Sequence, residues 1–471
     1  MKSEIKTDVA IIGAGISGLT AAHFLAKSGK SVVVLEKNSR IGGSIHSEKR
    51  DGFLIEHGPN STLETTPILG ELFANLNIQS QLQYATETAN KRYIVRYGKL
   101  NALPASPPAF IKSSLFSASA KLRLLKEPFI KPAPPEKDES LGAFVQRRLG
   151  QEFLDYAINP FVAGVYAGKP ETLCIKSAFP KLHQLEQEYG SLIKGAILGA
   201  RKRKKSAEKA KSHAKMLSFQ NGLQTVTDAI GKSLAKQIFT ETTIVSIRRD
   251  GGQFEIDVQS PDGESHISAT SLLLTVPAHQ YEKLPFEFDF PLQGQFENIY
   301  YPPVSMVYFG YKKQPDCVPL DGFGFLVPEK EQRQILGTLW SSSIFPGRMP
   351  DGGAALTTFV GGSRQPENAL LPDEQLSELV QNDLRELMGI TQKPDVVVIR
   401  KWQQAIPQYR LGHQQLMRDI ETFEQNNPGI FISGNFRGGI SVADCVKQAH
   451  GMSETIARFL VENKKVTLET A

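Results

Sequence analysis

Cysteines and metal-binding patterns are scarce in this sequence. The chain has three cysteines, Cys174, Cys317 and Cys445, which are far apart and form no CxxC pair. An odd number of widely spaced cysteines supports neither a disulfide framework nor a cysteine-ligated zinc site. The histidines are scattered without HExxH or a similar ligand spacing, so metal catalysis is not expected.

Long apolar runs are absent as well. No stretch reaches the ~18–20 residues that a membrane-spanning helix needs. The N-terminus "MKSEIKTDVAIIG" leads straight into a predicted strand, without the apolar segment and cleavage site of a secretory signal. We therefore expect a cytoplasmic protein, either free or bound peripherally to the inner face of the cell membrane.

Positive charge is concentrated in one short segment. The formal net charge is +5, and residues 201–215 hold eight lysines and arginines against one glutamate, so the other 456 residues together carry −2. This differs from the broad basic surface of nucleic-acid-binding proteins, and no nucleic-acid partner is expected. The composition, 40% hydrophobic and 22% charged over 471 residues, is typical of a folded protein with two or three domains.

The first 36 residues follow the pattern strand, glycine turn, helix, strand. Residues 9–12 are continuously apolar, as in a buried parallel strand, and residues 31–36 form a second strand after a helix that ends near Gly29. In the GxGxxG turn between them, the first glycine permits a tight turn, the second admits a pyrophosphate and the third lets helix and strand pack closely. The motif consists of Gly13, Ala14, Gly15, Ile16, Ser17 and Gly18.

The residues after the second strand distinguish FAD from NAD as the cofactor. Glu36 ends that strand, 21 residues after Gly15, where a carboxylate accepts a hydrogen bond from a ribose hydroxyl. In extended FAD folds the following loop wraps the diphosphate and the ribityl chain, which favours a basic residue and a flexible backbone. The sequence "EKNSRIGG" supplies both. The predicted FAD-binding residues of this segment are Glu36, Lys37, Arg40, Gly42 and Gly43.

The C-terminal part contains a second glycine loop. The sequence "GIFISGNFRGGISVADCV" predicts a strand before Gly434 and a helix after it, with Asp444 near the start of the helix. In FAD folds such a loop closes over the ribityl chain and the isoalloxazine ring. Two glycine loops at opposite ends of the chain imply one discontinuous, Rossmann-like FAD-binding domain.

The middle of the chain predicts two further units. Residues 105–214 mix prolines with amphipathic helical stretches, whereas later segments such as "VSMVYFGYKK" predict strands. Hairpin signals occur at residues 251–252 and 262–263. We predict an α/β protein with three domains. They are an FAD-binding domain of residues 1–85, 215–290 and 400–471, a mixed-sheet substrate-binding domain of residues 86–104 and 291–399, and a helical membrane-associated insertion of residues 105–214.

Several narrower motifs resemble those of the flavin-dependent protoporphyrinogen oxidases, within the larger amine-oxidase-like superfamily. The resemblance covers nearly the whole chain and rests on "EKNSRIGGSIHS", "EHGPNS", "PFVAGVYAGKPETL", "DGFGFLVP", "IPQYRLGH" and "SGNFRGGISVADCV". It implies FAD-dependent, six-electron oxidation of protoporphyrinogen IX to protoporphyrin IX in haem biosynthesis. Oxygen or another electron acceptor would reoxidise the flavin, with hydrogen peroxide as the product where the acceptor is oxygen. The resemblance is also compatible with a homodimer.

The resemblance also implies roles for individual residues. Arg92, between the cationic neighbours Lys91 and Arg96, would pair with a substrate propionate. A porphyrinogen is a large apolar ring with carboxylates on one edge, so it needs apolar walls as well as a cation. The implied apolar slot consists of Gly164, Phe323, Gly324, Phe325, Leu326 and Phe359. Further candidate cofactor residues are Gly58, Pro59, Asn60, Val245, Trp402 and Val442.

The implied chemistry asks little acid–base work of the protein. Hydride leaves a carbon bridging two pyrroles for flavin N5 while a pyrrole N–H loses its proton, so no strong protein base is required. The protein's task is to hold that carbon near the flavin in a dry slot. Asn60 is expected near the flavin, and no residue is assigned a catalytic role.

A membrane surface is a further expected partner. The stretch "PPAFIKSSLFSASAKLRLLKEPFIK" combines apolar residues with lysines, as an interfacial helix would. The basic segment 201–215 would add attraction to anionic lipid. The apolar residues of this stretch are Phe110, Ile111, Leu115, Phe116, Leu122, Leu124 and Leu125.

Three other functions remain open at this stage. A coproporphyrinogen III oxidase of the same fold would form coproporphyrin III, and its substrate carries four propionates instead of two. An amine oxidase or a carotenoid-type desaturase is less compatible, because "IPQYRLGH" does not resemble the motifs of amine oxidases. The flavin-free GDP-dissociation inhibitors use the same fold to bind proteins, but both glycine loops are intact here.

Overall fold

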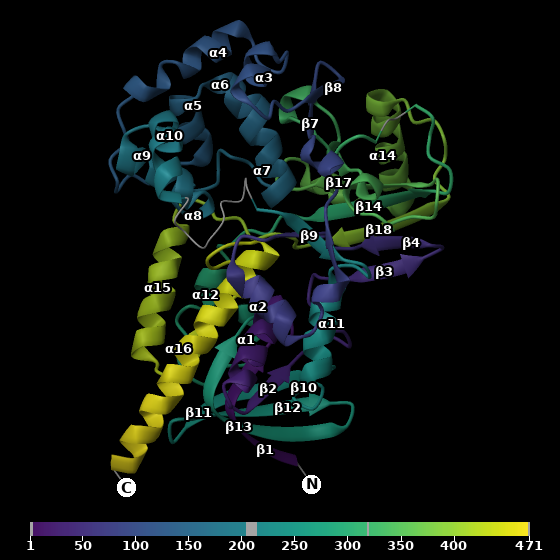
Figure 1. Cartoon of the computed structure of the whole chain (residues 1–471). Coiled ribbons are helices and arrows are strands. Elements are labelled where there is room, and N and C mark those ends of the chain that lie inside the picture. The colour runs from purple at the N-terminus through teal and green to yellow at the C-terminus, as the bar shows by residue number, and fades with distance from the viewer. Residues whose placement is uncertain (1–2, 204–213, 318–319, 470–471) are drawn as a thin grey trace.

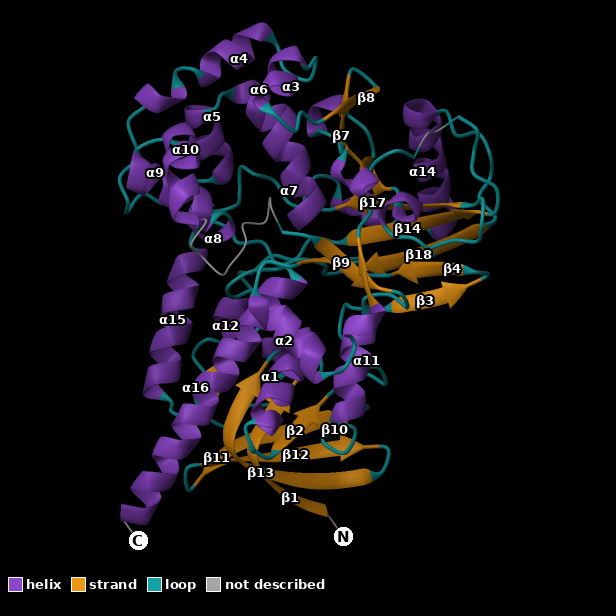
Figure 2. Cartoon of the chain, in the orientation of Figure 1, coloured by secondary structure: helices purple, strands orange, loops and turns teal. Residues whose placement is uncertain are grey.

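The computed structural model describes residues 3–203, 214–317 and 320–469. The first of two large sheets lies at the end of the molecule that carries the termini, and the second sheet and a layer of helices share the opposite end (Figures 1 and 2). The first sheet lies at the end that carries both termini, and its strands are ordered β10–β2–β1–β13–β12–β11, with β19 also paired to β13. Its strands are β1 (Ser3–Ile12), β2 (Val32–Leu35), β10 (Ile238–Phe239), β11 (Thr243–Asp250), β12 (Gln253–Ser260), β13 (Gly263–Leu274) and β19 (Ile430–Ile432).

Helices cover both faces of the first sheet. Along β1 the side chains alternate, so that Val9 and Ile11 enter one core while Ala10 and Ile12 enter the other. This explains the continuously apolar sequence, since a parallel strand buried on both faces has no polar side. The two predicted hairpins join β11 to β12 and β12 to β13. The helices of the first core are α1 (Ile16–Lys27), α2 (Pro67–Asn75), α11 (Gln224–Ser233) and α16 (Val442–Glu469), and α12 (Gln293–Phe296) and α15 (His413–Asn426) lie on the other face.

The two ends of the chain lie together. The ring of Phe24 on α1 meets the ring of His450 on α16 edge-on, with centroids 4.5 Å apart. Leu19 and Leu25 share a core with Ile456 and Leu460. The predicted order of strand, glycine loop and long helix at the C-terminus is confirmed by β19 and α16.

The second sheet is mostly antiparallel and packs against α14 (Asp373–Met388). Its strand order is β18–β14–β17–β16–β15–β7–β8. The one parallel pair among the described strands of this sheet joins β15 to β7, so a short N-terminal segment completes a sheet built mainly from later residues. Its strands are β7 (Tyr93–Arg96), β8 (Lys99–Ala102), β14 (Val304–Tyr311), β15 (Gly324–Leu326), β16 (Ile335–Leu339), β17 (Ala354–Gly361) and β18 (Val396–Trp402).

Two small sheets and a buried ion pair connect the large ones. Glu56 at the end of the β3–β4 hairpin pairs with Arg348 at 2.9 Å and accepts the Leu223 backbone N–H, also at 2.9 Å. Burial raises the pKa of Glu56 against the pull of the Arg348 charge. The strands are β3 (Ser47–Arg50) with β4 (Phe53–Glu56), and β5 (Thr62–Leu63), β9 (Met216–Phe219) and β6 (Leu82–Tyr84); the short α13 (Ser341–Ile344) precedes β17.

Residues 107–203 form the helical layer, at the end of the molecule opposite the termini (Figure 2). This confirms a mostly helical segment, while residues 204–213 of the basic segment lie outside the described residues. A π-helical turn, Leu154–Ile158, joins α6 directly to α7. The helices are α3 (Pro107–Lys112), α4 (Ala118–Leu124), α5 (Leu141–Arg148), α6 (Gln151–Phe153), α7 (Asn159–Tyr166), α8 (Ile175–Ala178), α9 (Pro180–Tyr189) and α10 (Leu192–Arg203).

The stretch expected to be one interfacial helix is instead two short helices with mixed burial. Leu115 and Phe116 lie between α3 and α4 and are buried in a core with Tyr156. Ile111 and Leu122, in contrast, are 71% and 64% exposed. The Ser117 side chain caps the N-terminus of α4. The second helix therefore begins anew at this residue, and the stretch does not form one continuous helix. Within the described ranges, no helix is both long and apolar enough to span a bilayer.

Candidate active site

The first glycine loop (residues 13–18) has the geometry of a dinucleotide site. Gly13 has a φ of +104°, which favours glycine. A Cβ at Gly18 would lie 2.0 Å from the Gly13 carbonyl oxygen, so helix α1 can begin there only with glycine. A Cβ at Gly15, however, would meet no atom within 4 Å. The loop therefore leaves open space at the N-terminus of α1, where a pyrophosphate binds.

Glu36 is held against this loop. Its Oε2 accepts the Ala14 backbone N–H at 2.9 Å. Its Oε1 accepts the backbone N–H and the side-chain amide of Asn38, at 2.9 and 2.6 Å. These contacts fix the carboxylate at the carboxyl end of β2, the position where a ribose hydroxyl is bound in Rossmann-like folds. Lys37 beside it is exposed.

The loop that follows β2 lies directly on the first glycine loop. The Gly42 N–H donates to the Ala14 carbonyl at 2.7 Å, and a Cβ at Gly43 would approach the Gly15 Cα to 3.2 Å. Arg40 holds the loop from inside, because its guanidinium donates to the carbonyls of Ile41, Gly43 and Ile45 at 2.6–2.8 Å. Burial and the nearby Arg400 charge lower the Arg40 pKa. Its visible role is to shape the loop; its role toward phosphate stays a prediction.

A third segment, residues 57–60, packs onto this loop. A Cβ at Gly58 would lie 2.0 Å from the Ser44 carbonyl oxygen, so the two backbones touch. Trp402, at the end of β18, donates its indole N–H to the His57 carbonyl at 2.9 Å. Pro59 and Asn60 follow half-buried. Gly58 and Trp402 are therefore brought next to the loop that follows β2, while a contact of Pro59 and Asn60 with the cofactor stays a prediction.

The second glycine loop (residues 433–441) arrives next to the first. The Ser433 N–H donates to the Leu274 carbonyl at 2.8 Å, and Gly434 has a φ of +147°. Asp444 accepts the Ser441 hydroxyl at 2.6 Å in the first turn of α16. The Val442 side chain lies in the first core, so its backbone N–H is the part available at the helix N-terminus.

Val245 lies farther out, at the edge of the first sheet. It is the residue at which the β11–β12 register shifts, and its side chain is 57% exposed. The same segment passes Glu36, whose carbonyl accepts the Thr242 N–H at 2.9 Å. Contact between Val245 and a cofactor remains a prediction.

Arg92 stands apart from its two cationic neighbours. Lys91 is paired with Asp321, and Arg96 is buried and paired with Glu152 at 2.6 Å. Arg92 has no carboxylate within ion-pair distance among the described residues, and its guanidinium lies over the Phe323 ring, 5.0 Å from the centroid. The residue as a whole is exposed, but partial burial of the guanidinium lowers its pKa. Arg92 is therefore the cation of the three that is free to meet an anionic ligand.

The predicted apolar slot is divided between the two faces of the second sheet. Leu326 faces the helical layer, where a Cβ at Gly164 would lie 2.6 Å from its Cδ2. Phe325 points the opposite way and is buried against α14. Gly324 has a φ of +127°, and a Cβ there would lie 2.1 Å from the Thr338 carbonyl oxygen. The half-buried Phe359 packs near Ala163 and Ala167 at the end of α7. Leu326 and Phe359 therefore face α7, and Phe325 lies in the core.

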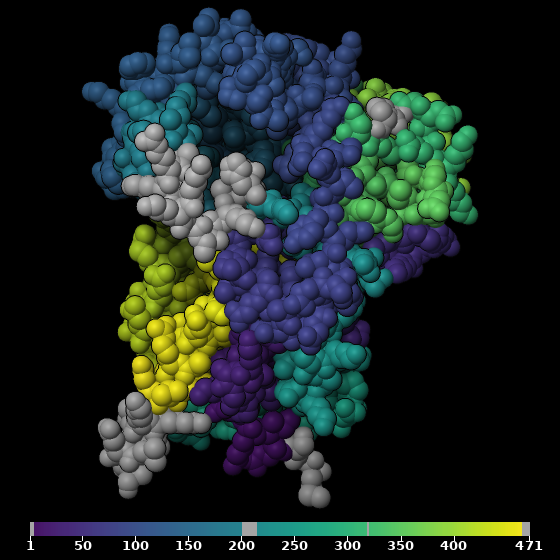
Figure 3. Space-filling view, in the orientation of Figure 1, coloured from purple at the N-terminus to yellow at the C-terminus, as the bar shows by residue number. Residues whose placement is uncertain are grey.

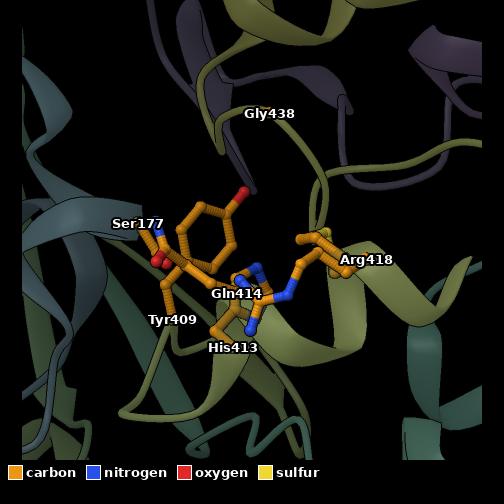
Figure 4. A pocket seen from close by; sticks show the side chains of 7 residues that line it. Ser177, Tyr409, His413, Gln414, Arg418 and Gly438 are labelled. Carbon is orange, nitrogen blue, oxygen red and sulfur yellow. The ribbon is translucent and has the colours of Figure 1, made fainter. Parts of the chain in front are cut away.

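The surface of the molecule is hollowed beside the helical layer. In Figure 3 a recess opens between the helical layer and the part of the chain that precedes it. A separate cavity of about 290 Å³ lies behind the second glycine loop (Figure 4). It is lined by Ser177, Tyr409, His413, Gln414, Met417, Arg418 and Gly438.

Sequence reasoning missed two groups of residues that build the site. The Thr275 hydroxyl donates to the Ile12 and Gly13 carbonyls, each at 2.9 Å, and so locks the first glycine loop. A threonine that ends the apolar run "LLLT" is a signal for this position. Tyr409 and His413 of "IPQYRLGH" contact the second glycine loop, although the motif served only to suggest the family.

Comparison with known proteins agrees with this geometry. Residues 16–456 match the family described as flavin containing amine oxidoreductase. The chain is 33% identical to protoporphyrinogen oxidase 2, chloroplastic/mitochondrial, of Arabidopsis thaliana over 96% of this chain and 94% of the relative. It is 28% identical to coproporphyrinogen III oxidase of Bacillus subtilis (strain 168), over 95% of this chain and 97% of the relative.

A solved structure supports the same assignment. The crystal structure of a candidate protoporphyrinogen oxidase from Exiguobacterium sp. 255-15 superposes with a TM-score of 0.81 at 25% identity, covering 97% of this chain and 99% of the other. The predicted FAD cofactor and the predicted α/β flavoprotein fold agree with these relatives. The open space at Gly15, the buried Glu36 and the two glycine loops fit that cofactor. The chain belongs to the flavin-containing amine oxidoreductases, among the relatives of the protoporphyrinogen and coproporphyrinogen oxidases.

Proposed function

We propose that the protein oxidises protoporphyrinogen IX to protoporphyrin IX with FAD. Three cycles remove six electrons and six hydrogens, and reoxidation by three molecules of oxygen gives three of hydrogen peroxide. The observation that carries the proposal is Arg92, a cation without a carboxylate partner among the described residues, stacked on Phe323. A tetrapyrrole with propionates on one edge needs such a cation together with apolar walls, for which Leu326 and Phe359 are the proposed side chains.

The chain's own residues orient the substrate. Bound FAD supplies the hydride acceptor. Arg92 would bind a propionate, which fixes one edge of the ring, and Leu326 with Gly164 would form a flat apolar wall. Such a wall excludes water from the reacting carbon, and holding that carbon in place supplies much of the rate enhancement. Because the pyrrole nitrogens release their own protons, the site needs no strong base.

Coproporphyrinogen III is the second candidate substrate. The relatives of that name in Bacillus subtilis and Staphylococcus aureus are 28% identical to this chain over 95% of its length. The Arabidopsis protoporphyrinogen oxidase is 33% identical. A substrate with four propionates needs more cations than Arg92, and of the three neighbouring cations the other two are already paired. The geometry therefore favours the substrate with two propionates.

The test is porphyrin fluorescence from each porphyrinogen, with hydrogen peroxide measured alongside. We expect a higher kcat/KM for protoporphyrinogen IX and three peroxides per porphyrin in air. A higher kcat/KM for coproporphyrinogen III would replace the first candidate by the second. A yellow, FAD-containing protein that oxidises neither substrate would contradict both. Porphyrin formation without peroxide would show that another acceptor replaces oxygen.

We also propose that the three domains predicted from the sequence are the structural units of the protein. We further propose that the helical layer contacts the inner face of the cell membrane from the cytoplasm. Support comes from exposed apolar side chains on one part of that layer: Ile111, Leu122, Leu125 and Phe129 are 64–86% exposed. They alternate in sequence with Lys112, Lys121, Lys126 and Lys131, a combination typical of interfacial binding.

Co-sedimentation with vesicles of phosphatidylglycerol and phosphatidylcholine tests this surface. We expect binding that weakens when Leu125 and Phe129 are both changed to serine. Val461, which is exposed on α16 and outside the helical layer, provides the control change to serine. Equal binding of the double variant and the wild type would remove the support for this surface.

A further inference from the structure

The segment 408–410 joins three parts of the molecule through its backbone. The Gln408 N–H donates to the Tyr300 carbonyl at 2.9 Å, a few residues before strand β14 of the second sheet. The Tyr409 carbonyl accepts the Cys174 N–H of the helical layer at 2.8 Å. Arg410 continues this pairing with Leu173. The main chain of Tyr409 is therefore fixed to the helical layer and lies next to the second sheet.

The Tyr409 side chain reaches from this anchor to the second glycine loop. Its hydroxyl donates to the Asn435 carbonyl at 2.6 Å and accepts the Gly439 N–H at 3.1 Å. One hydroxyl thus binds two backbone groups of the same loop. Figure 4 shows the ring of Tyr409 with its oxygen directed toward the loop that carries Gly438. The residue is 2% exposed, so water does not substitute for these bonds.

His413 supports the same loop. Its ring stacks on Tyr409, with centroids 4.3 Å apart and planes at 12°, as Figure 4 shows. Its imidazole forms a hydrogen bond with the Phe436 backbone, and burial lowers its pKa to about 4. The imidazole is therefore neutral at pH 7. Together the two side chains contact three of the residues between Ser433 and Ser441.

The loop needs such external support because its own backbone is permissive. Gly434, Gly438 and Gly439 all have positive φ, between +83° and +147°. Glycine loses the most conformational freedom when it is ordered. A hydroxyl anchored in another part of the protein offsets part of this entropy cost by holding the loop at Asn435 and Gly439.

The same segment also contacts the predicted substrate wall. Gln408 donates its side-chain amide to the Tyr166 carbonyl, at the last residue of α7, at 2.7 Å. Helix α7 carries Gly164, which packs on Leu326. Gln408 and Tyr409 are adjacent in sequence, so one short segment binds the end of α7 on one side and the second glycine loop on the other.

We propose that Tyr409 is a positioning residue that holds the second glycine loop in its FAD-binding conformation from an anchor on the helical layer. The proposal concerns the FAD site and holds for either porphyrinogen. It gives "IPQYRLGH" a physical role: the tyrosine hydroxyl binds the loop, the histidine ring supports it, and the backbone joins it to the helices.

The test compares holoenzymes of the wild type and Tyr409→Phe, which keeps the ring and its stacking. We expect FAD to be released about tenfold faster after dilution, as measured by FAD fluorescence, since two hydrogen bonds to the loop are lost and part of that loss is expressed in binding. Hydrogen exchange at residues 435–441 should accelerate, and the flavin absorption band should move toward that of free FAD.

Tyr166→Phe is the matched control. That hydroxyl is also buried and also binds one backbone carbonyl, Ala178, but within the helical layer. It should lower the melting temperature without changing FAD release or exchange in the loop. If Tyr409→Phe fails to fold, His413→Phe serves as the second variant and should accelerate FAD release in the same way.

Two results separate this proposal from the proposed function. Wild-type FAD release, exchange and flavin spectrum in both Tyr409→Phe and His413→Phe would overturn the positioning role. A wild-type protein that binds FAD firmly but oxidises no porphyrinogen would contradict the proposed function, while faster FAD release in Tyr409→Phe would still support the role of Tyr409.

Discussion

Leu326 occupies the space that a side chain at position 164 would need. A Cβ at Gly164 would lie 2.6 Å from Leu326 Cδ2, so helix α7 approaches strand β15 to a distance that glycine allows. Arg364 fixes the same junction by donating to the Val327 carbonyl at 2.6 Å and to the Asn159 carbonyl at 2.7 Å. The two elements that face the proposed tetrapyrrole site are therefore held together both by packing and by a buried guanidinium.

Gly164→Ala should displace Leu326 and raise the KM for the porphyrinogen several-fold with little change in kcat. Alanine favours a helix over glycine by up to about 1 kcal/mol, whereas overpacking costs about 1–3 kcal/mol. We expect a net loss of stability below about 2 kcal/mol. Steady-state kinetics and chemical denaturation measure the two effects.

Gly70→Ala on α2 is the control for the helix-forming effect, because a Cβ there meets no atom within 4 Å. It should stabilise the protein by about 0.5–1 kcal/mol and leave KM unchanged. If Gly164→Ala were equally stabilising and kinetically silent, the contact with Leu326 would not define the wall.

Gly15→Ala and Gly18→Ala should affect different properties of the first glycine loop. Space is open at Gly15, so its alanine variant should fold with a normal apoprotein melting temperature but bind FAD about 100-fold more weakly, since the methyl group meets the pyrophosphate. At Gly18 the methyl group would clash with the Gly13 backbone. This variant should lose both FAD and several degrees of apoprotein stability.

Differential scanning of the two apoproteins and FAD titration distinguish these outcomes. Equal destabilisation of both variants would mean that Gly15 is required for folding and that its open space is not reserved for the cofactor. Equal FAD affinity of Gly15→Ala and the wild type would place the pyrophosphate elsewhere.

The parts of the fold that sequence predicted are those encoded locally. The glycine turn, the strand that ends in Glu36 and the second glycine loop each follow from residues adjacent in sequence. The alternation of Val9 and Ile11 with Ala10 and Ile12 between two cores explains why a continuous apolar run predicted a buried strand.

The parts that escaped prediction depend on contacts between distant residues. The Tyr409 hydroxyl meets Asn435, 26 positions away, and Thr275 meets Gly13, 262 positions away. Leu115 and Phe116 look like their neighbour Ile111 in sequence, yet only tertiary packing decides that they are buried and it is not. Likewise, Arg92 could not be separated from Lys91 and Arg96 until their carboxylate partners were located.

Arg92→Gln should raise the KM for protoporphyrinogen about 10- to 100-fold, because a charge-assisted bond to a carboxylate is worth about 1.5–3 kcal/mol. The melting temperature should change little, since Arg92 has no ion-pair partner among the described residues whose charge would be left buried. Steady-state assays by porphyrin fluorescence give both kcat and KM.

Lys91→Gln is the control for general loss of positive charge at this edge of the sheet. Lys91 is already paired with Asp321, so its removal should leave KM within about twofold. If both variants raised KM equally, the effect would be one of net charge, and Arg92 would not bind the propionate directly.

The pH dependence of stability should reveal the buried neutral imidazole of His413. Burial lowers its pKa from 6.5 to about 4 in the folded protein. Between these values the unfolded chain binds a proton that the folded protein does not, so stability is fully present above pH 6.5 and is lost as the pH falls toward 4. A shift of this size corresponds to about 3 kcal/mol over the window.

Other groups titrate there as well, so the measurement is the difference in unfolding free energy between the wild type and His413→Phe, both as apoproteins. As the pH falls from 7 to 4.5, the unfolding free energy of the wild type should drop relative to that of the variant. The reason is that phenylalanine keeps the stacking on Tyr409 but takes up no proton. A difference that does not change with pH would show that His413 has the same pKa in the folded protein as in the unfolded chain, so that its burial does not keep it neutral.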